Sequence, residues 1–194
     1  YLGSCRYKMK DYTDDSADYD RLCQIFEKYD IGYFFYIGGN DSMDTVAKLS
    51  VYTREKGLDV KVVGIPKTID NDLWGTDMTF GFQSAVNIAS DVIDCIHTTA
   101  SSHSRVFIVE VMGHKVGWLT LNAGISGGAD IILIPEIPYD IDKVVEAINE
   151  RTRRGSKFTI LAVAEGAISK EDAALSKKEY KAKMANYKYP SVSY

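Results

Sequence analysis

The segment VGIPKTIDND, residues 63–72, joins an apolar run to groups that could handle a proton and a phosphate. Lys67 and Thr68 supply a cation and a hydroxyl, and Asp70 and Asp72 follow with two carboxylates. In an extended loop the two aspartates would project to the same side, roughly 6–7 Å apart. Phosphoryl transfer needs a base for the attacking hydroxyl, a metal ion and positive charge near the moving group. An Asx-rich turn stabilised by its own side chains explains these residues equally well.

A glycine pair ends another apolar run and precedes a helical pattern. Without Cβ atoms, Gly38 and Gly39 would let a phosphate approach the free N–H groups at a helix start. A tight turn with Asn40 or Ser42 as the N-cap is the simpler explanation of the pair alone. Asp41 places a negative charge where a phosphate would be attracted. A phosphate site here must therefore use that charge, through a metal ion or to repel part of a larger ligand.

Two more apolar runs end in residues of chemical interest. Met112, Gly113 and His114 follow one run, and Glu165 follows another. Arg105 begins the first of these runs, where its guanidinium group could hold an anion. The alternatives are a structural histidine, a solvated arginine and a glutamate that caps a helix or lies on the surface.

The pattern of apolar runs predicts the elements that position these residues. Strands are predicted at 32–39, 58–66, 105–113, 130–136 and 157–166, and helices at 16–29, 40–57, 78–101, 119–128, 140–155 and 170–187. Apolar strands joined by helices indicate an α/β protein, with three α/β/α layers around a mostly parallel sheet. Such sheets bind ligands beyond the carboxyl ends of their strands, where most of the candidate residues fall.

The composition is that of a globular protein and excludes several other classes. The 194 residues are 45% hydrophobic and 26% charged, with a formal net charge of −4. The absence of a basic stripe and of a long apolar run argues against binding to nucleic acid or a membrane. Cys5, Cys23 and Cys95 are scattered, which argues against disulfides or a zinc site and favours the cytoplasm. The opening and closing segments favour an internal piece of a longer protein.

Several segments together resemble the phosphofructokinase family. They are GGNDS, PKTIDND, GTDMTFGFQSA, SSHSRVFIVEVMGHKVG and AVAEGA, in the family's order and spacing, with LGSCR similar to its LGSxR segment. The resemblance runs from about residue 2 to residue 167. It implies a phosphofructokinase-like fold with parts of two lobes. Residues 1–85 would form part of the donor-binding lobe and residues 86–194 part of the fructose 6-phosphate-binding lobe, with the N- and C-terminal parts of the full protein missing.

The resemblance also implies a role for each matching residue. Asp70 is similar to the general base that takes the proton from the 1-hydroxyl of fructose 6-phosphate in glycolysis. Asp72 resembles an acid near the transferring phosphate and Mg²⁺, and Asn40 occupies a metal-binding position. Sugar-phosphate contacts are implied for Thr68, Ile69, Asp70, Arg105, Met112, Gly113, His114 and Glu165. Contacts to the donor phosphate are implied for Arg6, Gly38, Gly39, Ser42 and Lys67. Arg105 would reach the sugar phosphate of a neighbouring subunit, which implies a homo-oligomer.

Two positions resemble members of the family that use pyrophosphate. Asp41 and Lys67 stand where ATP-using bacterial members usually have glycine, and with Asp70 they form the predicted catalytic set. A carboxylate at Asp41 would repel the α-phosphate of a nucleotide, and the ammonium group of Lys67 would hold pyrophosphate. Opposite unit charges about 4 Å apart are worth about 4 kcal/mol near a protein surface. The sequence therefore predicts pyrophosphate as the donor, with an ATP-dependent enzyme as the alternative.

Two departures from the family pattern bear on activity. Asn40 is a weaker ligand for Mg²⁺ than the aspartate of many members. His114 replaces an arginine, and histidine lacks the two-pronged guanidinium group and is largely neutral at pH 7. Either Lys115 compensates or the transition state is stabilised less. A catalytically impaired regulatory relative is therefore a further alternative, and the piece alone is predicted to be inactive.

Overall fold

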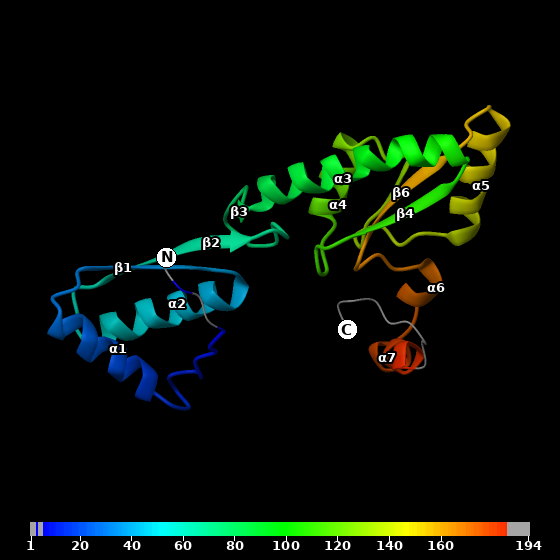
Figure 1. The fold of residues 1–194 in the computed structure, drawn as a ribbon. Coiled ribbons are helices and arrows are strands. Elements are labelled where there is room, and N and C mark those ends of the chain that lie inside the picture. The colour runs from blue at the N-terminus through cyan, green and yellow to red at the C-terminus, as the bar shows by residue number, and fades with distance from the viewer. Residues whose placement is uncertain (1–2, 4–5, 186–194) are drawn as a thin grey trace. The chain divides into compact units, whose positions relative to one another are not determined.

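The computed structural model describes residue 3 and residues 6–185, which form two compact units (Figure 1). Unit 1 contains the described residues up to Thr68 together with Leu73–Thr76. Unit 2 contains Ile69–Asp72 and the described residues from Asp77 onward. The lobe boundary predicted after residue 85 falls within a helix of unit 2. The ligand assigned to each lobe stays a prediction.

Unit 1 is a parallel strand pair covered by two helices. Its elements are α1 (Ala17–Lys28), β1 (Tyr33–Gly38), α2 (Asn40–Glu55) and β2 (Lys61–Thr68). The helices bury Tyr19, Phe26 and Leu49, and Phe34 and Val62 of the strands pack against this cluster. These apolar side chains recur at helical and alternating strand spacing, which explains why the segments form an amphipathic layer on a sheet.

The second face of the unit 1 strands is not covered by the described residues. Tyr33, Phe35 and Ile37 alternate with the packed side chains of β1, and each is more than half exposed. Among the described residues, α1 and α2 both pack on the same face of this pair, and the other face is open.

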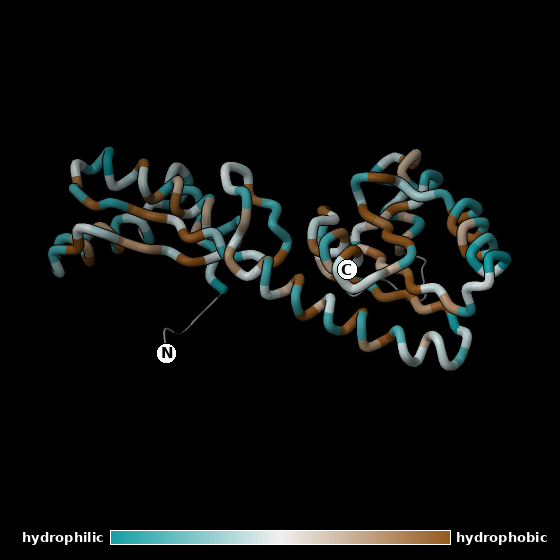
Figure 2. Tube along the Cα trace, turned by 90° about the horizontal axis from the view of Figure 1, so that it is seen from above, coloured by the Kyte–Doolittle hydropathy of each residue, from teal (hydrophilic) through white to brown (hydrophobic). Residues whose placement is uncertain are grey.

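Unit 2 is built around three parallel strands. Its elements are β3 (Phe80–Gly81), α3 (Phe82–His103), β4 (Val106–Val111), α4 (Trp118–Ser126), β5 (Ile131–Leu133), α5 (Ile141–Arg153), β6 (Thr159–Ala164), α6 (Lys170–Ala173) and α7 (Lys177–Ala185). The strand order is β4-β6-β5, and both pairings are parallel. Figure 2 shows hydrophobic residues concentrated along the strands and alternating with hydrophilic ones along the helices.

The sheet of unit 2 has helices on both faces. Ile93 of α3 and Ala123 of α4 pack with Ile160 of β6, and all three side chains are fully buried. Thr159 precedes Ile160 and points to the opposite face, where its hydroxyl accepts a hydrogen bond from Arg151 of α5. The parallel three-layer arrangement predicted from the sequence is therefore present in this unit.

The C-terminal helix predicted at 170–187 is instead two helices within the described residues. α6 ends at Ala173, and α7 begins at Lys177. The break occurs because Ser176 and Glu179 form a capping box, in which each side chain accepts a hydrogen bond from the backbone N–H of the other. Residues 186 and 187 of the prediction lie outside the described part of the chain.

Candidate phosphoryl-transfer site

In unit 1, predicted donor residues lie together at the carboxyl ends of the two strands. The register pairs Gly38 with Pro66, so the residues that follow each strand leave the sheet side by side. A Cβ atom on Gly39 would lie 3.6 Å from the carbonyl oxygen of Lys67. The structure therefore brings the glycine pair and Lys67 together, as the positions of the strand ends predict.

The glycine pair shapes the start of α2. A Cβ atom on Gly38 would lie 2.1 Å from Ser42 Oγ, so no other residue fits there while Ser42 keeps its position. Gly39 is the N-cap, and the alternative with Asn40 or Ser42 in that role is therefore wrong. A glycine cap has no side-chain oxygen to accept hydrogen bonds from the first turn. A helix start of this kind suits an anionic ligand.

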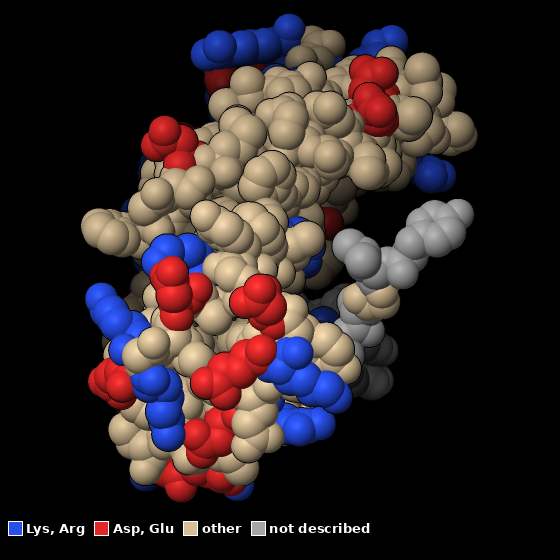
Figure 3. All heavy atoms as spheres, turned by 90° about the vertical axis from the view of Figure 1, so that its left-hand side faces the viewer, with Lys and Arg blue, Asp and Glu red and all other residues tan. Residues whose placement is uncertain are grey.

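Asp41 lies in the first turn of α2 and contacts the segment before α1. Lys8 Nζ is 3.7 Å from Asp41 Oδ1, and the two side chains are 82% and 85% exposed. Such an exposed ion pair contributes little free energy, so the carboxylate can still act on a ligand. Arg6 is exposed two residues before Lys8, so the segment that carries it passes near the start of α2. Acidic and basic side chains are interspersed on the face shown in Figure 3.

The turn that carries Asp70 and Asp72 is bent, not extended. Asn71 between them has a φ of 54°, in the left-handed region that asparagine tolerates better than most residues. Its Oδ1 accepts a hydrogen bond of 2.8 Å from the backbone N–H of Thr79, and its Nδ2 donates one of 3.2 Å to the carbonyl oxygen of Asp77. Of the two geometries that the sequence left open, the extended loop is not present, because the side chain of Asn71 stabilises a local turn.

Ile69 connects this turn to the core of unit 2. Its side chain packs on the buried cluster of Phe82, Val86, Val111 and Leu119. A residue predicted only as a substrate contact thus also fixes the position of the aspartate turn. Neither this packing role nor that of Asn71 was foreseen, although an asparagine between two aspartates is itself a signal for a left-handed turn.

The loops after β4 and β6 meet, as the sequence predicts for the Met112–His114 turn and Glu165. The register pairs Val111 with Ala164, and the backbone N–H of Glu165 donates a 3.0 Å hydrogen bond to the carbonyl oxygen of Val111. His114 has a φ of 52°, and its backbone N–H donates to Glu165 Oε1. This bond fixes one oxygen of the carboxylate at the carboxyl end of the sheet.

Two glycines allow the close approach of these loops. A Cβ atom on Gly113 would lie 2.6 Å from the carbonyl oxygen of Val116. One on Gly166 would lie 2.2 Å from the carbonyl oxygen of His114. Any side chain at either position would displace the backbone that orients Glu165.

A pocket of about 410 Å³ opens where these loops meet. Its lining combines polar and charged side chains with short apolar ones: His114, Lys115, Pro135, Glu165, Gly166, Ala167, Ile168 and Tyr180. Concave sites with a few convergent polar groups are typical of small-ligand binding. Lys115 and Tyr180 are lining residues that the predicted site did not include.

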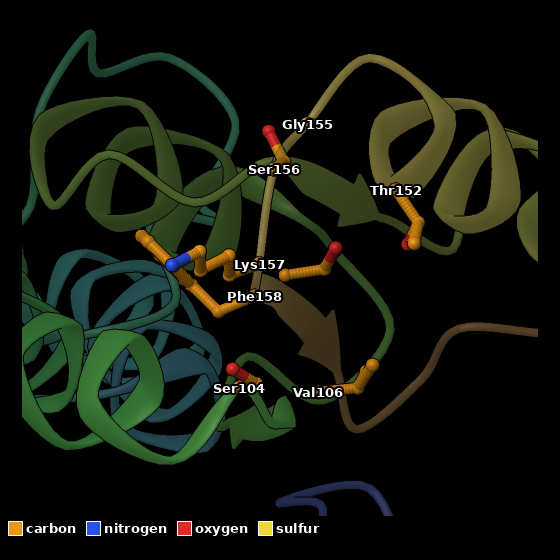
Figure 4. Close-up of a pocket in the computed structure, with 8 residues that line it drawn as sticks. Ser104, Val106, Thr152, Gly155, Ser156, Lys157 and Phe158 are labelled. Carbon is orange, nitrogen blue, oxygen red and sulfur yellow. The ribbon is translucent and has the colours of Figure 1, made fainter.

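Arg105 lies at the other end of β4 from His114. The strand between them has six residues, which corresponds to a length of about 20 Å. A second pocket of about 520 Å³ lies at that end (Figure 4). Ser104, Val106, Thr152 and the residues from Gly155 to Thr159 line it, and none of them belongs to the predicted site. Within one chain, Arg105 therefore does not join the residues around Glu165.

A metal site made by protein groups alone is not present among the described residues. No group of three or more His, Cys, Asp or Glu side chains is close enough there to hold an ion. Mg²⁺ often binds through one or two carboxylates, water and substrate phosphates. The carboxylates of the 69–72 turn fit that mode. Within the described part of the chain, no helix has the length and hydropathy needed to span a membrane.

The fold and the placement of these residues define a class: parallel α/β proteins that bind ligands at the carboxyl ends of their strands. A sequence model of the family named phosphofructokinase matches residues 1–191. The chain belongs to the phosphofructokinase family.

Proteins named for two different phosphoryl donors are similar to this chain. An ATP-dependent 6-phosphofructokinase of Spirochaeta thermophila is 46% identical over 185 residues, covering 95% of this chain and 49% of that protein. The pyrophosphate-dependent phosphofructokinase of Nitrosospira multiformis has a TM-score of 0.76 and 32% identity, covering 88% of this chain and 44% of that one. That of Marinobacter aquaeolei has a TM-score of 0.74 and 34% identity, covering 97% and 48%. The chain therefore spans about half the length of these relatives.

Proposed function

We propose that the protein containing this chain transfers a phosphoryl group from pyrophosphate to the 1-hydroxyl of fructose 6-phosphate. The product is fructose 1,6-bisphosphate, and the reaction is a reversible step of glycolysis. One observation carries the proposal: Ile69 ties the turn bearing Asp70 and Asp72 to the cluster that contains Val111. The loop after Val111 in turn meets Glu165.

The two carboxylates of the aspartate turn, Asp70 and Asp72, have different roles in the reaction. Asp70 takes the proton of the attacking hydroxyl, and a positioned base of this kind accelerates reactions by about 10²–10⁴-fold. Asp72 faces the transferring phosphate and Mg²⁺. Asn40, which lies in unit 1, is a secondary candidate for the ion. When bound, Mg²⁺ would neutralise charge on the phosphates.

The sugar phosphate binds through the loops at the carboxyl ends of β4 and β6. Glu165 accepts a hydrogen bond from the sugar through the carboxylate oxygen that His114 does not engage. Met112 and Gly113 precede His114 in the same turn, and Ile69 of the aspartate turn and Thr68 at the end of β2 supply further contacts. Arg105 lies at the far end of β4, so it would serve the site of a neighbouring subunit in a homo-oligomer.

The phosphoryl donor binds at the carboxyl ends of β1 and β2. Arg6, Gly38, Gly39 and Ser42 contact its phosphates, and the N-terminus of α2 adds a favourable dipole. Lys67 holds pyrophosphate through its ammonium group. Asp41 disfavours a nucleotide because its carboxylate would lie near the α-phosphate.

ATP is the second candidate donor. The names of the curated relatives, such as that of S. thermophila, favour it, whereas the names of two structural relatives favour pyrophosphate. We favour pyrophosphate because Asp41 would repel a nucleotide and Lys67 would hold pyrophosphate. A catalytically impaired regulatory relative is less favoured, because Lys67, Asp70 and Asp72 are all retained.

The reaction itself is tested by ³¹P NMR on the protein expressed from its full coding sequence. Fructose 6-phosphate, pyrophosphate and Mg²⁺ should give the signals of fructose 1,6-bisphosphate and inorganic phosphate. Omission of Mg²⁺ should stop the conversion. If the bisphosphate forms with neither pyrophosphate nor ATP, the assignment to catalysis is contradicted and the regulatory alternative is favoured.

A further inference from the structure

One wall of the pocket beside Glu165 comes from an element that the proposed function does not use. His114, Lys115 and Glu165 belong to loops that follow strands, whereas Tyr180 belongs to α7. The sequence predicts a helix there, and no residue of α7 is buried. Tyr180 is nevertheless partly buried and lines the pocket.

The start of α7 is fixed by its capping box. The backbone N–H of Ser176 donates a 2.9 Å hydrogen bond to Glu179 Oε2, and that of Glu179 donates one of 3.3 Å to Ser176 Oγ. Tyr180 is the residue after Glu179, and its backbone N–H donates a 2.9 Å hydrogen bond to the carbonyl oxygen of Ser176. The tyrosine thus lies in the capped first turn of the helix.

Polar contacts link α7 to the elements that carry the pocket. Lys183 of α7 forms an ion pair with Asp172 of α6. The backbone N–H of Asp172 donates a 3.1 Å bond to Ser169 Oγ, which caps α6. The segment before α6 makes two backbone hydrogen bonds to Tyr139, of 3.0 and 2.8 Å. The chain that leaves the pocket at Ile168 is therefore tied down and returns to it at Tyr180.

The groups that meet in the pocket suit a polyhydroxylated anion. Lys115 and His114 supply a positive charge and an imidazole, and Glu165 offers a hydrogen-bond acceptor. A tyrosine adds an apolar ring face for the C–H groups of a sugar and a hydroxyl for one of its oxygens. Few other side chains combine these two properties at so low a cost in conformational entropy.

We propose that Tyr180 is a binding residue for the sugar phosphate, with α7 as the docked wall that positions it. The ring packs on the sugar, and the phenolic hydroxyl hydrogen-bonds to a sugar hydroxyl. This inference rests on the proposed function, since it assumes that fructose 6-phosphate occupies the pocket beside Glu165. It adds a contact and an element that the resemblance to the family did not assign.

The test uses the protein expressed from its full coding sequence. It compares the KM values of Tyr180→Phe and Tyr180→Ala for fructose 6-phosphate and for the phosphoryl donor with those of the wild type. Loss of the hydroxyl in Tyr180→Phe should raise the KM for fructose 6-phosphate about threefold. Loss of the ring in Tyr180→Ala should raise it about tenfold or more. The KM for the phosphoryl donor should change less than about twofold, because the donor binds elsewhere.

Lys181→Ala is the matched control, because Lys181 is the next residue of α7, is exposed and does not line the pocket. It should leave both KM values unchanged. A wild-type KM for fructose 6-phosphate in Tyr180→Phe overturns the inference and leaves the proposed function standing. Equal rises in the two KM values point to a structural role for Tyr180 and also overturn it. No saturation of the wild-type protein by fructose 6-phosphate overturns the proposed function together with the inference.

Discussion

Asp70 carries the chemistry in this account, and its test is a loss of turnover without loss of binding. Asp70→Asn keeps the shape of the side chain and removes its basicity. We expect kcat to fall about 10²–10⁴-fold, with little change in the KM for fructose 6-phosphate. Asp77→Asn is the matched control, because only the backbone carbonyl of Asp77 accepts the bond from Asn71. A kcat within threefold of the wild type in Asp70→Asn would remove Asp70 from the role of base.

Lys67 and Asp41 are predicted to act on the donor and not on the sugar. Lys67→Gly should reduce kcat/KM for pyrophosphate by about two decades, since it removes a charge worth several kcal/mol near the donor. Asp41→Gly should improve the use of ATP by relieving repulsion of the α-phosphate. Initial rates at varied donor concentration and saturating fructose 6-phosphate measure both effects. Equal losses with both donors in Lys67→Gly would contradict a role in donor choice.

Among the structural elements, the turn around Asn71 determines where Asp70 and Asp72 point. Asn71→Ala should destabilise the protein by about 1–3 kcal/mol, because it removes the hydrogen bond that Asn71 accepts from the backbone N–H of the buried Thr79. Asn71→Gly tolerates the left-handed φ and loses only the hydrogen bonds, so it separates the two contributions. Urea unfolding gives the free energies. An Asn71→Ala variant as stable as the wild type would show that the turn forms without this side chain.

The start of α5 gives a prediction about pH. The backbone N–H of Lys143, with further help from Lys170, lowers the pKa of Asp140, the N-cap residue. A carboxyl with a lowered folded-state pKa stabilises the fold above its unfolded pKa, and this contribution disappears as the pH falls through the folded value. The difference in thermal unfolding temperature between wild type and Asp140→Ala should therefore be larger at pH 7 than at pH 3. Asp142→Ala is the control, and a difference independent of pH would contradict the capping role.

For the whole molecule, the sequence predicts the five main strands and, within each unit, the parallel pairing that brings their carboxyl ends together. A short, continuous apolar run such as 159–164 is typical of a buried strand. Parallel pairing of two such strands then places Met112 beside Glu165. Local interactions decide the features that were missed. The capping box at Ser176 splits the last predicted helix, and the side chain of Asn71 bends the aspartate turn. Apolar periodicity carries no information on either.

The coverage of the unit 1 strands could not be predicted for a different reason. A parallel pair with apolar residues on both faces normally has both faces covered. The described residues supply helices for one face only, and the chain spans about half the length of its relatives. The hydrophobic pattern of a strand shows that a face is suited to burial, but it does not show which segment covers it.

The choice of phosphoryl donor is tested most directly by one comparison. The protein expressed from its full coding sequence is assayed with pyrophosphate and with ATP, each varied at saturating fructose 6-phosphate and Mg²⁺. We expect a kcat/KM for pyrophosphate at least about two decades above that for ATP, because of the charges of Asp41 and Lys67. Phosphorylation of fructose 6-phosphate by ATP and not by pyrophosphate would contradict it.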